Sequence, residues 1–236
     1  MQDVGLRFDV SLMALCYGYV ILMIFVSDRL GEHPNISRKA SRKFLHAMIG
    51  NLIFVIPFFS WGFAPFLVAA PFIAVTFLAS PYSPFQDLRD RLGGLSSLTE
   101  EGHHAGLILY SVSFSILALL LASKPYAMAA GILPMAYGDS AAALVGERYG
   151  RRRHGLVSGK SLEGSLGMFA ASLLSLAVSM VFFSSLYSFS VAEKMVPALV
   201  VVVIATFVEY FSPRGFDNLT VPLLGAATFL LVDGWL

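Results

Sequence analysis

The stretch GDSAAALVGERYGRRRHGLVSGKSLEG, residues 138–164, decides how this chain can fold and what it can bind. It starts inside one apolar segment and ends at the start of another. Between the two lies a basic, glycine-containing loop, with Asp139 before it and Lys160 and Glu163 at its end. An acid within an apolar run beside such a loop indicates a site for a metal-bound polyphosphate at the rim of a membrane.

The composition is that of an integral membrane protein. The chain has 236 residues, of which 57% are hydrophobic and only 13% charged, whereas soluble domains have about 25% charged residues. The mean hydropathy of +0.74 agrees. We therefore expect a single integral membrane domain over residues 1–236. The first apolar run, 10–27, is too long for a signal-peptide core and lacks a small-residue cleavage site, so we interpret it as a retained helix.

Apolar segments long enough for membrane helices recur along the chain, since a span needs about 20 such residues. We expect an all-α, polytopic transmembrane bundle of seven or eight helices, because a β-barrel would show short alternating strands. The last segment is short and contains Pro222 and Gly225, so it is either a partial span or a broken helix. The candidate helices are 10–27, 44–60, 62–80, 104–122, 125–147, 164–183, 195–211 and 218–232.

The basic residues are unevenly distributed over the connections between these segments. Of the 16 lysines and arginines, all except Arg7, Lys124 and Lys194 fall in the first, third, fifth and seventh connections. Because cytoplasmic loops carry an excess of Lys and Arg, this side is expected to face the cytoplasm, with both termini on the other side if there are eight spans. A nucleotide would be bound on the cytoplasmic side.

The third connection contains an amphipathic piece, SPFQDLRDRLGGL, residues 83–95. On a helix, Phe85, Leu88 and Leu92 would share one face. Such a pattern suits a helix lying in the plane of the membrane interface, and a solvated loop helix is the alternative.

Asp139 lies near the cytoplasmic end of the 125–147 segment. A carboxylate within an apolar run is costly, so it is a functional hypothesis by default; a structural aspartate bonded to Ser140 is the alternative. Small residues recur at every fourth position around it and at the start of the next helix. We expect these two faces to pack closely and to hold Asp139 beside the loop. They are Gly138, Ala142, Gly146 and Gly150, against Gly164, Gly167 and Ala171.

The loop nearly matches the phosphate-loop pattern G-x-x-x-x-G-K-[ST]. However, Gly155 is one residue too close to Gly159, and no strand precedes it, so the P-loop fold is rejected. The underlying physics still applies, because glycines let backbone N–H groups approach phosphate oxygens and Lys160 is a mobile point charge. Ser161, or the Gly159–Lys160 peptide, can cap the next helix, whose positive end favours anions.

Two further groups in this loop each have two interpretations. Glu163 is either part of a capping arrangement or a metal ligand. The cluster Arg151, Arg152 and Arg153 either binds phosphate or is a topogenic cluster set against anionic lipid.

A third polar cluster is EYFSPRGFDNLT, residues 209–220. Pro213 and Gly215 are typical of a helix stop, and Asp217 or Asn218 is typical of the N-cap that follows. Capping does not explain Glu209, which ends an apolar run. Acids at two adjacent helix ends, on the same side of the membrane as the acid of the 125–147 segment, could share a divalent cation.

A basic face precedes the second helix. Lys39, Arg42, Lys43 and His46 would share one side of it. This face either binds an anionic substrate or is only the positive-inside signal, and His46 could equally be a core histidine. The histidines at 103–104 have no third ligand-like partner nearby in sequence, so no zinc site is predicted.

Four segments together resemble the polyprenol kinase family, meaning the dolichol kinases, phytol kinases and related CTP-dependent lipid kinases. They cover about a quarter of the chain, and the last of them looks most like the phytol kinase branch. The segments are RKFLHAMIG (42–50), GDSAAALVGERYGRR (138–152), GKSLEGSLGMF (159–169) and EYFSPRGFDNLTVP (209–222). The resemblance implies CTP or another nucleoside triphosphate as donor, Mg²⁺ as cofactor and an isoprenoid alcohol (a polyprenol, phytol or geranylgeraniol) as acceptor, with no nucleic-acid partner.

The functional hypothesis is a membrane kinase that moves the γ-phosphate of CTP to a lipid alcohol, a reaction governed by positioning and charge neutralisation. The expected catalytic residues are Asp139, Lys160 and Asp217. The expected Mg²⁺ ligands are Asp139, Glu163 and Glu209. The expected substrate-binding residues are Arg42, Lys43 and His46. The expected nucleotide- and phosphate-binding residues are Ser140, Arg151, Arg152, Arg153, Gly159, Lys160, Ser161, Gly164 and Asn218.

Two other functions fit parts of the pattern. A cytidylyltransferase acting on a phospholipid precursor would also use CTP, but the long Asp-rich pattern of such enzymes is not seen. A small-solute transporter would suit intramembrane acids and interrupted helices. Against the transporter, no matched pair of repeats is seen, and the polar groups gather on one side of the membrane.

Overall fold

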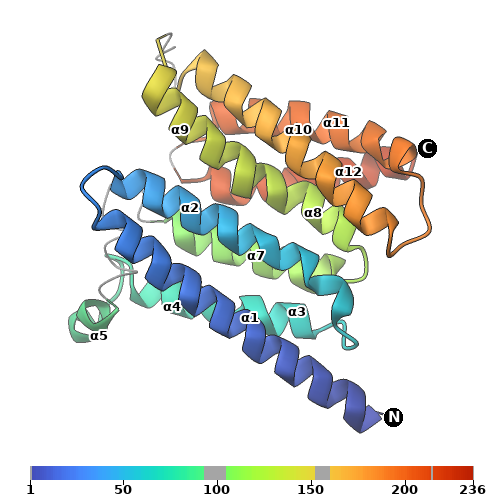
Figure 1. Ribbon diagram of the computed structural model, residues 1–236, viewed down its shortest axis with the longest axis horizontal. Helices are drawn as coiled ribbons and strands as arrows, with labels where there is room; N and C mark the ends of the chain where they lie inside the picture. Colours follow the sequence, from blue (N-terminus) through green and yellow to red (C-terminus); the bar gives the residue numbers. More distant parts are fainter. Residues whose placement is uncertain (1, 93–104, 152–159, 214, 236) are drawn as a thin grey trace.

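The computed structural model describes residues 2–92, 105–151, 160–213 and 215–235, and within these ranges the chain is helical and has no strand. The helices lie alongside one another in one bundle (Figure 1). The predicted all-α bundle is therefore confirmed.

Each of the predicted segments is helical within the described ranges. The longer helices are α1 (Gln2–Gly31), α2 (Arg38–Gly50), α7 (Gly106–Leu121), α10 (Leu162–Ser184), α11 (Val191–Phe211) and α12 (Asp217–Asp233). The 62–80 segment forms α3 (Ala64–Ala69) and α4 (Pro71–Leu78), and α5 (Gln86–Arg91) lies within the amphipathic piece. The 125–147 segment forms α8 (Pro125–Leu133), the π-helical turn η3 (Pro134–Gly138) and α9 (Asp139–Tyr149).

Prolines and caps explain where the observed helices differ from the predicted ones. Helix α2 begins earlier than predicted because the Ser37 hydroxyl accepts a hydrogen bond from the Ala40 N–H, 3.1 Å away. After α2 the chain continues as the 3₁₀ turns η1 (Asn51–Phe54) and η2 (Ile56–Phe58), the latter around Pro57, which has no N–H. Helix α12 continues through Pro222, so the prediction of a broken last helix was wrong.

By length and composition, four helices can cross a membrane in the described part of the chain. They are Gly5–Gly31, Pro125–Tyr149, Leu162–Ser184 and Val191–Phe211. Shorter apolar helices cover Ala64–Leu78 and Gly106–Leu121. Large apolar side chains such as Leu15, Leu174 and Phe207 are exposed on the outer faces. A bundle with an apolar exterior of this kind suits a lipid environment.

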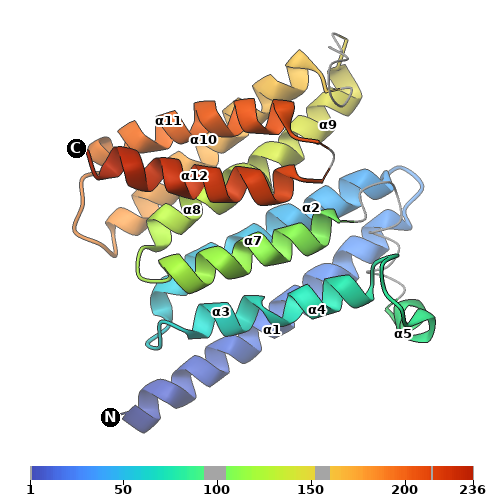
Figure 2. The same cartoon turned by 180° about the vertical axis from the view of Figure 1, so that it is seen from behind.

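The helix Pro125–Tyr149 lies at the centre of the bundle. In its apolar stretch of 18 residues, 72% of the residues are buried, compared with 17% in the corresponding stretch of α1. It runs between α2 on one side and α10 on the other (Figure 1), and the reverse view shows the same arrangement (Figure 2). Asp139, on this helix, is therefore surrounded by protein.

The small-residue faces predicted to pack together do so. A Cβ added to Gly164 would lie 2.9 Å from the carbonyl oxygen of Ala142, and one added to Gly167 would lie 3.2 Å from that of Ala141. At Gly138 the added atom would lie 2.7 Å from the sulfur of Met168. Helices α9 and α10 therefore approach so closely that larger residues would not fit.

The polar connections lie together at one end of the bundle, and both chain termini lie at the other. At the first end lie the α1–α2 connection, helix α5, the last turns of α9 and α11, and the first turns of α10 and α12 (Figure 2). This arrangement is the one expected for eight passes along the bundle. It brings the polar clusters of the sequence, which are far apart along the chain, to one end of the molecule.

Candidate active site

Asp139 is the first residue of α9, directly after the π-helical turn Pro134–Gly138. Single π-helical turns inside helices are frequent at functional sites. The aspartate is buried, and it accepts a hydrogen bond from the ammonium group of Lys43 on α2, which is also buried. The first member of the site is thus a carboxylate held by a lysine from a neighbouring helix.

Ser140 fastens the same two helices together. Its hydroxyl donates to the carbonyl oxygens of Ala136, 2.6 Å away, and Lys43, 3.0 Å away. The predicted phosphate-binding role of Ser140 is not visible in these contacts. Their effect is to fix the start of α9 against α2, and hence the position of the neighbouring aspartate.

Glu209 and Asp217 come from the last turn of α11 and the first turn of α12. The connection between them turns sharply at Gly215, whose φ of +85° is readily adopted only by glycine. A hydrogen bond of 2.9 Å between the hydroxyls of Ser212 and Thr220 joins the two helix ends. The turn therefore places two buried carboxylates side by side.

Asp139, Glu209 and Asp217 form one acidic cluster. Each offers one carboxylate oxygen, and these three oxygens lie within 4.8 Å of one another. Oxygen ligands of this kind suit a hard divalent cation. The buried side-chain oxygen of Asn218, next to Asp217, accepts no hydrogen bond from the described residues. The donor set therefore fits Mg²⁺.

Lys160 contacts the same cluster from the residue pair that precedes α10. Its ammonium group lies 2.7 Å from a carboxylate oxygen of Glu209 and 3.4 Å from one of Asp217, and it also donates to the backbone carbonyl of Glu209. Burial alone would lower the pKa of Lys160, but Glu209 and Asp217 outweigh it and raise the pKa above its usual value. Lys160 is therefore a cation at neutral pH.

Other predicted residues at this end lie outside the acidic cluster. Glu163 accepts a hydrogen bond of 3.3 Å from the backbone N–H of Arg151, and it is not part of the group of three carboxylates. The Ser161 hydroxyl caps α10 by accepting from the Gly164 N–H at 3.1 Å. The cap was predicted and is confirmed, whereas the metal role of Glu163 stays a prediction.

Some predicted phosphate-binding residues lie outside the described residues. These are Arg152, Arg153 and Gly159. Arg151, which directly precedes them in the sequence, is described, and its side chain is exposed.

The predicted substrate-binding residues of α2 are all buried. These are Arg42, Lys43 and His46. His46 stacks against the Tyr110 ring of α7, with ring centroids 4.8 Å apart and an interplanar angle of 19°. Tyr110 was not among the predicted site residues, because a tyrosine within an apolar segment is typical of packing. The pairing of Lys43 with Asp139 was missed as well, since no spacing rule links residues on separate helices.

No known family model and no solved structure matches the chain. Several characterised proteins do. The chain is 37% identical to a phytol kinase of Synechocystis sp. over 218 residues, which cover 91% of this chain and 87% of the relative. It is 28% identical to a chloroplastic farnesol kinase of Arabidopsis thaliana, over 86% of this chain and 68% of that protein. A dolichol kinase of Saccharomyces cerevisiae matches at 28% identity, over 65% of this chain and 30% of its own length.

All three relatives are named as kinases of isoprenoid alcohols. The chain therefore belongs to the family of isoprenoid-alcohol kinases that includes the phytol, farnesol and dolichol kinases.

Proposed function

We propose that this protein transfers the γ-phosphate of CTP to the hydroxyl group of an isoprenoid alcohol of the phytol, geranylgeraniol or polyprenol type. The observation that carries the proposal is the buried cluster of Asp139, Glu209 and Asp217, with Lys43 and Lys160 set among the acids. Three carboxylates and two lysines at the polar end of the bundle are suited to a metal-bound triphosphate.

The carboxylates of Asp139, Glu209 and Asp217 would hold Mg²⁺. When bound, the metal ion would neutralise charge on the phosphate oxygens. The lysines now paired with these acids would then turn to the phosphates. Lys160, at the start of α10, has the mobile ammonium group that such a change needs. The helix end behind it, capped by Ser161, favours anions as well.

The transfer itself needs an in-line approach of the alcohol and a place for its proton. The acceptor oxygen forms a bond to the γ-phosphorus while the bond from that phosphorus to the β-phosphate oxygen breaks. CDP leaves, and the hydroxyl proton passes to a carboxylate, Asp217 or Asp139. The apolar helices hold the isoprenoid tail, so that only the hydroxyl reaches the polar end of the bundle.

The donor and the orientation in the membrane are further parts of this proposal. CTP is supported by the family resemblance of the four sequence segments. A cytoplasmic site is supported by the basic connections, which lie at the same end of the bundle as the acidic cluster.

A product assay tests the proposal. The purified protein in nanodiscs is supplied with labelled CTP or ATP and with phytol, geranylgeraniol, farnesol, a long polyprenol or diacylglycerol, in the presence of Mg²⁺. The expected products are a prenyl monophosphate and CDP. Release of pyrophosphate would instead assign a cytidylyl transfer, and turnover of diacylglycerol alone would exclude an isoprenoid acceptor.

A further inference from the structure

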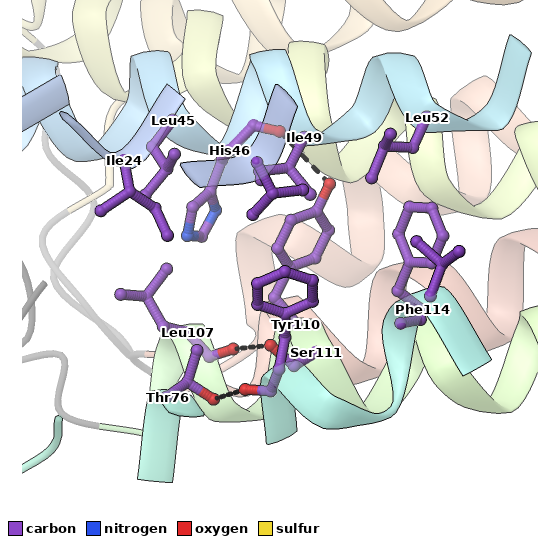
Figure 3. Close-up of a pocket in the computed structure, with 14 residues that line it drawn as sticks. Ile24, Leu45, His46, Ile49, Leu52, Thr76, Leu107, Tyr110, Ser111 and Phe114 are labelled. Carbon is purple, nitrogen blue, oxygen red and sulfur yellow. Dashed lines mark hydrogen bonds between the residues drawn. The ribbon is translucent and has the colours of Figure 1, made fainter. Parts of the chain in front are cut away.

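An apolar pocket lies beside the acidic cluster and is lined by residues of α1, α2, η1, α3, α4 and α7. Figure 3 shows the α2 side chains on one side of the pocket and Leu107, Ser111 and Thr76 on the opposite side. The pocket extends from Leu45 on α2 to Leu52 on η1, and along α7 from Leu107 to Phe114. At 1.5 Å per helical residue, this length is about 10 Å. The pocket is therefore long enough for the end of a hydrocarbon chain, and its walls are almost wholly apolar.

Most polar side chains that line this pocket are held by backbone carbonyls. The Thr76 hydroxyl donates to the carbonyl oxygen of Phe72 at 2.7 Å, and the Ser111 hydroxyl donates to that of Leu107 at 3.0 Å. The remaining polar residues are Tyr110, whose hydroxyl donates to the His46 carbonyl at 3.2 Å, and His46 itself. The ring nitrogens of the His46 imidazole are groups that can hydrogen-bond a hydroxyl.

His46 marks the end of the pocket that adjoins the acidic cluster. It follows Lys43 by one helical turn on α2, and Lys43 donates to Asp139. His46 is also near enough to Asp139 to interact with it electrostatically. Stacking on Tyr110 fixes the plane of the imidazole ring. Figure 3 shows this ring at the Leu45 end of the pocket, away from Leu52 and Phe114.

We infer that this pocket binds the hydroxyl-bearing end of the acceptor, with the His46 imidazole hydrogen-bonding the hydroxyl group; the assignment rests on the proposed kinase function. The pocket spans about a third of the ~30 Å hydrocarbon core of a bilayer. It therefore holds only the isoprene units next to the hydroxyl, and the rest of the tail lies among the lipids. The shape of the first units is selected, whereas the total chain length is not.

A pair of matched substitutions tests the location of the acceptor. Ala69 lines the pocket and is buried, whereas Ala170 is exposed on the outer face of α10. Ala69→Leu should raise the KM for farnesol and for geranylgeraniol about tenfold, because added methylenes take up the space of the ligand. The KM for CTP should not change. Ala170→Leu should leave both constants unchanged.

The role of His46 is tested by comparing the effect of a substitution on the use of the prenol with its effect on the binding of the nucleotide. His46→Phe keeps an aromatic ring against Tyr110 but has no ring nitrogen. It should lower kcat/KM for the prenols by about tenfold or more, which corresponds to the loss of one well-placed hydrogen bond to the substrate. The thermal stabilisation of the protein by Mg²⁺ with CTP should remain. A loss of that stabilisation would mean that His46 serves the nucleotide site instead, and would overturn its assignment.

A binding measurement separates failure of the pocket from failure of the kinase function. Geranylgeraniol without nucleotide should raise the midpoint of thermal unfolding of the wild type and of Ala170→Leu, but not of Ala69→Leu. If Ala69→Leu does not fold, Val68→Ile adds a single methylene to the same wall. Geranylgeraniol should then raise the unfolding midpoint of Val68→Ile less than it raises that of the wild type. Full stabilisation of both pocket variants by the prenol would overturn the inference, even if the wild type proves to be a kinase.

Discussion

Asp139, Glu209 and Asp217 are so close together that their charges require cations in the site. All three are buried, with oxygens within 4.8 Å of one another. Like charges at this distance oppose ionisation strongly unless a counter-ion is present. In the structure the ammonium groups of Lys43 and Lys160 play that part. Under the proposed function, a metal ion and phosphates would take the place of these two lysines as partners of the acids.

Asp139→Asn should abolish the kinase reaction. The amide keeps the size of the side chain but cannot carry the negative charge that attracts Mg²⁺, so we expect kcat to fall by about 10²-fold or more. The variant should remain monodisperse in detergent by size-exclusion chromatography. Glu147→Gln is the control, since Glu147 lies on the same helix and is exposed. Substantial residual turnover of Asp139→Asn would contradict the metal role.

Lys160→Met should separate metal binding from phosphate binding. Removal of the ammonium group leaves Glu209 and Asp217 without their nearest cation. We expect Mg²⁺ alone to stabilise this variant against heat more than it stabilises the wild type, because the metal no longer competes with a lysine. The KM for CTP should rise about tenfold or more. An unchanged nucleotide KM would remove Lys160 from the phosphate site.

At the scale of the elements, the central helix and α10 depend on small residues where they cross. The Cβ of an alanine at Gly164 would lie 2.9 Å from a backbone carbonyl oxygen, which cannot move as a flexible side chain would. At Gly18 of α1, by contrast, an added Cβ meets nothing within 4 Å. We therefore expect a glycine-to-alanine substitution to affect stability differently at these two positions.

Gly164→Ala should destabilise the protein by about 1–3 kcal/mol, because the two helices must separate to admit the methyl group. Gly18→Ala should be neutral or stabilising by up to about 1 kcal/mol, because alanine favours the helix. Thermal unfolding in the same detergent measures both. Equal stability of the two variants would show that the crossing is not tightly packed.

Sequence patterns predicted the helices and the small-residue crossing because both follow from local composition. Small residues at every fourth position from Gly138 can be recognised within one segment, and the partner face at Gly164 lies in the next. The partners of individual charged side chains could not be predicted from the sequence. Lys43 was expected to serve the substrate and Glu163 to serve the metal, yet Lys43 contacts Asp139, and Glu163 contacts the Arg151 backbone. Such pairings depend on how α2, α10 and α11 are rotated, which no single segment specifies.

At the scale of the whole molecule, the acidic cluster and the basic connections lie at one end of the bundle and both termini at the other. Because cytoplasmic segments carry an excess of Lys and Arg, this distribution of charge predicts an orientation in the membrane. The loop end should face the cytoplasm, where the nucleotide is available.

Cysteine labelling in a Cys16→Ser background tests this orientation. Asn35 is exposed in the α1–α2 connection, and Trp235 is exposed near the C-terminus. A membrane-impermeant maleimide should label Trp235→Cys in intact cells, and Asn35→Cys only after permeabilisation, because the two positions lie at opposite ends of the bundle. The reverse pattern would place the acidic cluster on the outside.

The π-helical turn Pro134–Gly138 sets the direction in which the following residues point. It inserts one residue more than a regular α-helical turn would hold, and each α-helical residue corresponds to a rotation of about 100°. Without that extra residue, α8 could keep its place in the core while α9 turned its carboxylate toward another neighbour. A one-residue change in the length of this helix would thus move the carboxylate out of the acidic cluster while the helices kept their packing. We therefore expect the position of the carboxylate to be more sensitive to such a change than the fold is.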